Sequence, residues 1–169
     1  MKRVSLLAGV LVFAAWALPT AAGAVSTNPD VPTQLRVNTI IGQMNQGDGK
    51  SFENYYTFKA GPGTVKVRVT LRAGSDAGDL QIGLADADGN QLSPATCTGN
   101  CNGNNVIAAG QGDNLTTATF HLDTEKTLTV HVHGGVQYYH AVPHPTYRIS
   151  FDGDVKLDKT AAPLKVDNR

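Results

Sequence analysis

The sequence predicts an all-β protein, a jelly-roll-like β-sandwich of about eight antiparallel strands. Apolar and polar residues alternate over residues 65–72 (VKVRVTLR) and again over residues 128–133 (LTVHVH). This period of two is typical of strands with one buried face. The chain also contains 18 glycines and 8 prolines, a composition that favours short strands joined by turns. After the N-terminal segment, we find no stretch with helical periodicity and caps.

The N-terminus indicates export. Lys2 and Arg3 precede an apolar run over residues 6–18, and the small residues of Ala22-Gly23-Ala24 follow it. This is the pattern of a cleaved signal peptide. The alternative is a membrane-spanning helix, which needs roughly 20 apolar residues, more than this run supplies. We therefore expect a signal peptide over residues 1–24 and a secreted or periplasmic protein.

The remaining length suits a single domain. We expect a flexible lead-in over residues 25–36, the sandwich over residues 37–154, and a tail over residues 155–169 without strand pairing. Basic and acidic residues are equal in number, 14 of each, and they form no basic block. Nucleic acid and anionic membrane surfaces are therefore poor partners. We also expect no membrane insertion once the signal is removed.

The other predicted strands follow at short spacing. Alternating or apolar runs place them at residues 56–58, 80–84, 115–122 and 147–151. Turn residues interrupt the strands at Gly61-Pro62-Gly63, Asp88-Gly89, Gly134-Gly135 and Asp152-Gly153.

The two cysteines, Cys97 and Cys101, lie in a segment that reads as a loop, SPATCTGNCNGNN. In an oxidising compartment such a pair predicts one disulfide. A redox or metal site is the alternative, although redox sites more usually have CxxC spacing and zinc needs further ligands. Because the closed loop is short, the expected stabilisation is below the ~3 kcal/mol of a 15-residue loop.

Several turn and core segments also occur in an order typical of one bacterial domain family. They are Ile41-Gly42, Gly47-Asp48, Tyr55-Tyr56-Thr57-Phe58, Gly61-Pro62-Gly63, GDLQIGL at residues 78–84, DADGN at residues 86–90, Thr129-Val130-His131-Val132 and Tyr147-Arg148-Ile149-Ser150. In these residues the chain resembles the bacterial pre-peptidase C-terminal (PPC) domain, from Ile40 to Phe151.

The resemblance implies a jelly-roll-like sandwich of the kind appended to exported peptidases and other enzymes. Some such domains resemble collagen- or polysaccharide-binding modules, and some bind calcium at acidic loops. This chain departs from the family pattern at two places: Asn54 replaces an acidic residue, with Glu53 one place earlier, and Gln81 replaces an Asp. Both changes weaken the case for a calcium site inferred from the family resemblance. No peptidase domain accompanies the module in this sequence.

Acidic residues on either side of residues 80–84 are the first candidate site. Asp79, Asp86 and Asp88 could supply oxygen ligands to calcium. The EF-hand pattern fails, because it needs Gly at the sixth position and Glu at the twelfth, where Gln91 and Cys97 stand. The alternative is that these residues form hairpin turns.

The histidines are the second candidate. All five lie between His121 and His144, and His131 and His133 project from the same face of a predicted strand. With His140 or His144 from the following loop, they could bind zinc or copper. The alternative is a solvated sheet face, because the sequence shows no carboxylate placed beside them.

Aromatic residues of the same loop are the third candidate. Exposed Tyr138 and Tyr139 would offer rigid rings to a sugar or protein partner, unless they pack in the core. Lys66 and Arg68 would add to this binding surface if they shared the face of His131.

No G-x-S-x-G or H-E-x-x-H motif occurs, and we expect no catalytic residue, with a small secreted hydrolase as the minor alternative. The sequence thus favours a non-catalytic binding or accessory module for an extracellular polysaccharide, another extracellular polymer, or an exported protein or enzyme. The alternative is a periplasmic metal-binding protein using the histidines. We predict no obligate cofactor, with calcium or zinc as the candidates.

Overall fold

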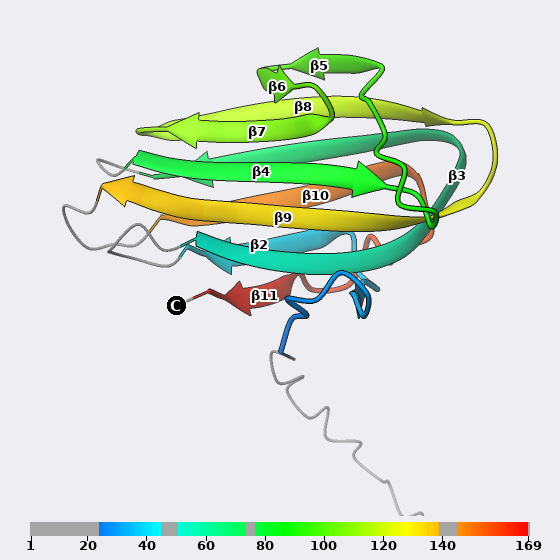
Figure 1. Cartoon of the computed structure of the whole chain (residues 1–169), viewed down its shortest axis with the longest axis horizontal. Coiled ribbons are helices and arrows are strands. Elements are labelled where there is room, and N and C mark those ends of the chain that lie inside the picture. Colours follow the sequence, from blue (N-terminus) through cyan, green and yellow to red (C-terminus); the bar gives the residue numbers. More distant parts are fainter. Residues whose placement is uncertain (1–23, 45–50, 74–76, 139–144, 169) are drawn as a thin grey trace, which may run out of the picture.

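The computed structural model describes residues 24–44, 51–73, 77–138 and 145–168, and in these ranges it is all-β (Figure 1). No helix among them is long and apolar enough to cross a membrane. The predicted signal peptide lies outside the described residues. The strands are β1 (Thr33–Gln34), β2 (Thr39–Gln43), β3 (Ser51–Arg72), β4 (Ala77–Ala85), β5 (Thr96–Thr98), β6 (Asn100–Asn102), β7 (Asn105–Gly110), β8 (Asp113–Leu122), β9 (Lys126–Tyr138), β10 (Thr146–Val155) and β11 (Leu164–Asp167).

The long strand β3 divides the fold into two layers. Its first half, residues 51–60, pairs with β9, whereas residues 63–72 pair with β8 and β10. Between them the chain bends at Gly61 and Gly63, which have φ angles of 85° and 123° that only glycine adopts readily. We call the layers the β9 sheet (β1, first half of β3, β9, β4, β7, β6) and the β10 sheet (β11, β2, β10, second half of β3, β8, β5).

The core lies between these two sheets. Val65, Val67, Val69 and Leu71 are fully buried, which confirms the predicted inward row of this strand. Rings from the two sheets meet across the core, as where Phe58 of β3 contacts Phe151 of β10 at 5.0 Å between ring centroids. The predicted sandwich is therefore confirmed, although two strand pairs, β1–β3 and β2–β11, are parallel.

The lead-in and the tail, where the structure describes them, both pair with strands of the sandwich. In the lead-in, Ser26 bridges to Tyr55 and β1 pairs with β3. In the tail, β11 pairs with β2, so the prediction of no strand there is wrong. Asn168, just after β11, accepts a hydrogen bond from Asn54 Nδ2 and donates one to the buried Tyr147 hydroxyl. These side-chain bonds hold the tail to the sandwich.

Three of the segments predicted as turns lie within strands instead: Gly61-Pro62-Gly63 at the bend of β3, Gly134-Gly135 in β9 and Asp152-Gly153 in β10. Gly134 belongs to β9 and faces Phe52 across the sheet; a Cβ there would lie 2.8 Å from the Phe52 ring. The glycine thus provides room for an aromatic side chain. Gly153 lies in β10, where the pairing with β3 shifts register, so it marks a β-bulge. By contrast, Asp88 and Gly89 do form a turn after β4.

Candidate functional site on the outer face of the β9 sheet

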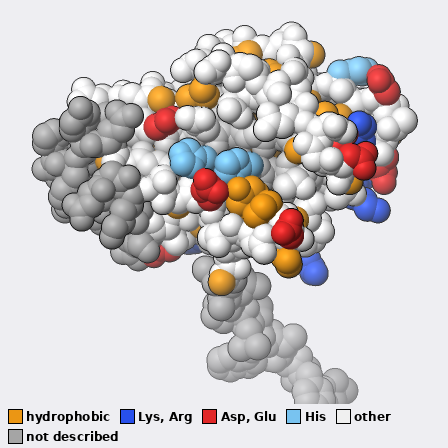
Figure 2. Space-filling view, viewed as in Figure 1, with side chains coloured by type: hydrophobic (Ala, Val, Ile, Leu, Met, Phe, Trp, Pro, Cys, Tyr) orange, Lys and Arg blue, Asp and Glu red, His pale blue; other side chains and the backbone are white. Residues whose placement is uncertain are grey.

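Strand register brings a carboxylate beside the two predicted histidines. In the antiparallel pairing of β3 with β9, Glu53 lies opposite His133 and Tyr55 lies opposite His131. All four side chains project outward, because their neighbours Asn54, Tyr56, Val130 and Val132 are buried. Figure 2 shows histidine, acidic and hydrophobic side chains gathered on this face. Glu53 is therefore a carboxylate beside the two histidines. The sequence alone does not place it there, because its position depends on how these two strands pair.

The ligand atoms of these three residues converge. His131 Nε2 lies 3.8 Å from Glu53 Oε2, and His133 Nδ1 lies 3.7 Å from Glu53 Oε1. One nitrogen or oxygen atom from each residue lies within 4.8 Å of the other two. Both imidazole-to-carboxylate distances exceed those of a hydrogen bond. The histidines and Glu53 are neighbours without direct hydrogen bonds between them.

Tyr55 fixes one side of this cluster. The Tyr55 ring stacks on the His131 ring, with 4.7 Å between the ring centroids and an interplanar angle of 6°. The Tyr55 hydroxyl donates a hydrogen bond to Glu53 Oε2 at 3.0 Å. Partial burial lowers the pKa of His131, and the neighbouring His133 lowers it further, while Glu53 raises it. The net effect is a pKa for His131 below its usual value, which favours the neutral imidazole. His131 Nε2 is buried and has no hydrogen-bond partner.

A groove of about 480 Å³ begins beside Tyr55 and His131. Outward-facing residues of four strands form its floor. Gly83 lies opposite His131 in this sheet and has no side chain that would fill the groove. The turn after β4 and the segment at Pro29 and Asp30 form its walls. Its polar lining includes Asp30, Asp88, Gln91, Asn105 and Thr129. The groove therefore offers hydrogen-bonding groups beside one aromatic ring.

The three aspartates predicted as a calcium site do not lie together. Asp79 is near the start of β4 and Asp86 follows its end, which separates them by roughly 23 Å along the strand. The Asp86 carboxylate accepts hydrogen bonds from the backbone amides of Asp88 and Asn90 and from Lys126 Nζ. Desolvation is the largest single influence on the pKa of this carboxyl and raises it, but the hydrogen bonds together outweigh it and hold the pKa below its usual value. Asp86 thus organises the turn.

The other predicted binding residues are not part of this cluster. Lys66 and Arg68 are exposed on the half of β3 that belongs to the β10 sheet, on the opposite outer face of the sandwich. The expectation that they share a face with His131 is therefore wrong. Tyr139, His140 and His144, and the side chain of Tyr138, lie outside the described residues.

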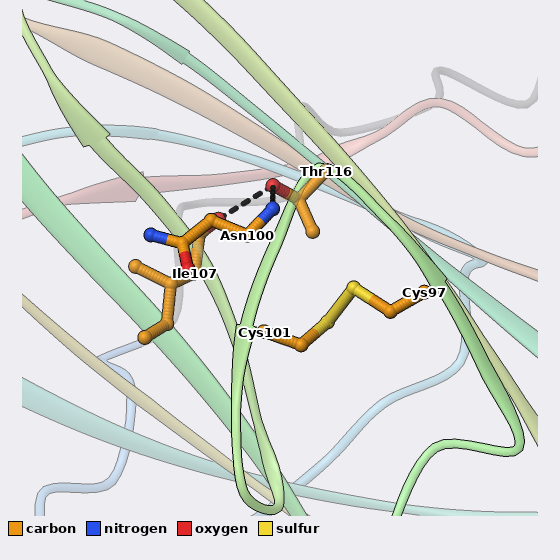
Figure 3. Close-up of a disulfide and its surroundings, with 5 residues drawn as sticks. All are labelled: Cys97, Asn100, Cys101, Ile107 and Thr116. Carbon is orange, nitrogen blue, oxygen red and sulfur yellow. Dashed lines mark hydrogen bonds between the residues drawn. A yellow bond between two sulfur atoms is a disulfide. The ribbon is translucent and has the colours of Figure 1, made fainter.

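The predicted disulfide Cys97–Cys101 is present, but the segment around it is not a simple loop. Cys97 lies in β5, paired with β8, and Cys101 lies in β6, paired with β7. The bond therefore joins the two sheets where the chain crosses between them (Figure 3). Beside it, the buried Thr116 hydroxyl donates to Ile107 O and accepts from Asn100 N. Both contacts close this edge of the sandwich.

Comparisons with known proteins add little to this geometry. No family model matches the sequence, and no curated protein matches it. Among solved structures, the chain is similar to the 1.0 Å crystal structure of the pre-peptidase C-terminal domain of collagenase from Bacillus anthracis. The identity is 18% and the TM-score is 0.30, over 71% of this chain and 93% of that one. A match this weak supports no conclusion about family or function, so the fold is established by the strand pairing above.

Proposed function

We propose that this chain is a secreted or periplasmic, non-catalytic binding module whose binding surface is the groove on the outer face of the β9 sheet. Its ligand is an extracellular polysaccharide. The observation that carries the proposal is the open groove, in which the Tyr55 ring lies beside carboxylate, amide and hydroxyl side chains. Aromatic rings stack on sugar rings, and polar side chains bind the sugar hydroxyls.

The chemical setting agrees with a role outside the cytoplasm. A disulfide such as Cys97–Cys101 is typical of proteins that fold in oxidising compartments. The N-terminal pattern of the sequence indicates the same destination. An exported protein or enzyme is the competing partner, and the test below distinguishes it from a polysaccharide.

Co-sedimentation with insoluble polymers tests the proposal. Peptidoglycan, cellulose and chitin represent polysaccharides, and collagen represents a protein polymer. We expect one polysaccharide to deplete the protein from solution. Tyr55→Ala and Asn105→Ala should each weaken that depletion at least about tenfold, since each removes a group that lines the groove.

The opposite face provides matched controls. Lys66→Ala and Arg68→Ala alter exposed residues of the β10 sheet and should leave binding unchanged. Loss of binding in these variants, or depletion by collagen alone, would contradict the proposal. Turnover of a bound polymer by the purified protein would contradict its non-catalytic part.

A further inference from the structure

We propose that Glu53, His131 and His133 bind one divalent transition-metal ion of the zinc(II) class on the outer face of the β9 sheet. The inference goes beyond polysaccharide recognition and does not depend on it. It rests on the kind of ligand atoms, on their separation, and on the lack of a hydrogen-bond partner for His131 Nε2.

The donor set is the one that zinc prefers. Two imidazole nitrogens and one carboxylate oxygen occupy three positions of a tetrahedral ion and leave the fourth to solvent. Imidazole ligands also bind copper(II) and nickel(II) well, whereas magnesium and calcium favour oxygen ligands. The chemistry of the residues therefore selects a transition metal.

The separations are close to those that an ion requires. Two ligands that each lie 2.0–2.1 Å from a tetrahedral ion are about 3.4 Å apart. The observed distances from Glu53 oxygens are 3.8 Å to His131 Nε2 and 3.7 Å to His133 Nδ1. These two distances involve different Glu53 oxygens, and one ligand atom from each residue lies within 4.8 Å of the other two. Separations of up to that value must shorten by up to about 1.4 Å to suit a tetrahedral ion. The Glu53 side chain is 50% exposed, so it has room to move toward the histidines and admit the ion.

The strands fix the remaining ligands in advance. His131 and His133 are two residues apart on β9, and Tyr55 holds the His131 ring by stacking at 4.7 Å. The Tyr55 hydroxyl also binds the Glu53 carboxylate, which is the type of support that orients metal ligands. His131 Nε2 is buried without a hydrogen-bond partner, an unfavourable state that a bound ion would relieve.

Isothermal titration with zinc, copper(II), calcium and magnesium tests this site, using protein without a histidine tag. We expect one zinc or copper ion per chain, with calcium and magnesium not competing. Glu53→Gln and His133→Gln should each weaken binding at least about tenfold. Cobalt(II) should give the intense visible bands of a tetrahedral complex in the wild type and lose them in both variants.

Two controls locate the ion. His121 lies 3.6 Å from the Asp123 carboxylate on an exposed part of β8, so His121→Gln removes a comparable histidine elsewhere and should not change binding. A variant with His140→Gln and His144→Gln should also bind normally. The proposal is overturned if no transition metal binds. It is equally overturned if Glu53→Gln and His133→Gln bind as the wild type does, or if the His140 and His144 variant loses the ion.

Discussion

Replacement of Thr116 by valine tests whether the Thr116 hydroxyl holds the two sheets together at the edge beside the disulfide. The Thr116 side chain belongs to β8 and is only 2% exposed. Its hydroxyl donates a hydrogen bond to Ile107 O at 2.6 Å and accepts one from Asn100 N at 3.1 Å. Ile107 and Asn100 lie in strands of the β9 sheet, so the hydroxyl links the two layers beside the disulfide. Valine keeps the shape and removes both bonds.

The expected cost follows from these two bonds. A hydrogen bond contributes about 1 kcal/mol net to folding, so Thr116→Val should lower the free energy of unfolding by about 2 kcal/mol. Buried groups left without partners would increase this cost. For a domain of this size, such a loss corresponds to a fall in Tm of about 6 °C.

Urea unfolding followed by circular dichroism measures the change. The matched control is Thr119→Val on the same strand, where the side chain points outward and is half-buried. The control should stay within about 0.5 kcal/mol of the wild type. Equal stability of Thr116→Val and the wild type would refute the idea that this hydroxyl joins the sheets.

Three further predictions concern packing, pH and the disulfide. Gly42→Ala should lower the free energy of unfolding by about 1–3 kcal/mol or more in urea titrations, because a Cβ there would overlap the buried Tyr147 ring; full stability would contradict this packing. Burial raises the pKa of Tyr147 to about 12, above the usual 10. The neutral phenol is thus favoured in the folded state, so the contribution of Tyr147 to stability should be complete below pH 10 and fall by roughly 2 kcal/mol by pH 12. Burial also raises the pKa of Tyr56, which adds to the total fall over this range. Tyr147→Phe should reduce the slope of the unfolding free energy against pH by about one proton over this range, measured by melts at a series of pH values. An unchanged slope would count against the raised pKa of Tyr147. Replacing Cys97 and Cys101 by serine should lower the free energy of unfolding by about 2 kcal/mol, the value for closing a five-residue loop. Thermal unfolding of the variant and the wild type measures this loss, and a larger loss would show that the bond stabilises the fold by more than loop closure.

The strand periodicity was sufficient to predict the fold class. Residues 65–72 and 128–133 lie in β3 and β9 with the predicted faces buried. Short strands were missed where that signal is weak, as in β5 and β6 around the cysteines, which have three residues each. Gly134 was mistaken for a turn because its role is to accommodate Phe52, a residue far away in sequence.

The candidate site shows the same limit. The sequence placed His131 and His133 on one exposed face, since that depends only on alternation within one strand. It could not place Glu53 beside them, because strand register is set by pairing between segments about 80 residues apart. It also could not separate Lys66 from this face, because the bend of β3 at Gly61 and Gly63 moves it to the other sheet.

The proposed function requires that ligands bind in the groove beside Tyr55. An NMR titration with soluble fragments of the polysaccharide that depletes the protein in the co-sedimentation assay tests this requirement. We expect chemical-shift changes concentrated at Tyr55, Asn105 and Thr129, which line the groove, and none at Lys66 or Arg68. Changes centred on Lys66 and Arg68 would place the binding surface on the β10 sheet and contradict the proposed function.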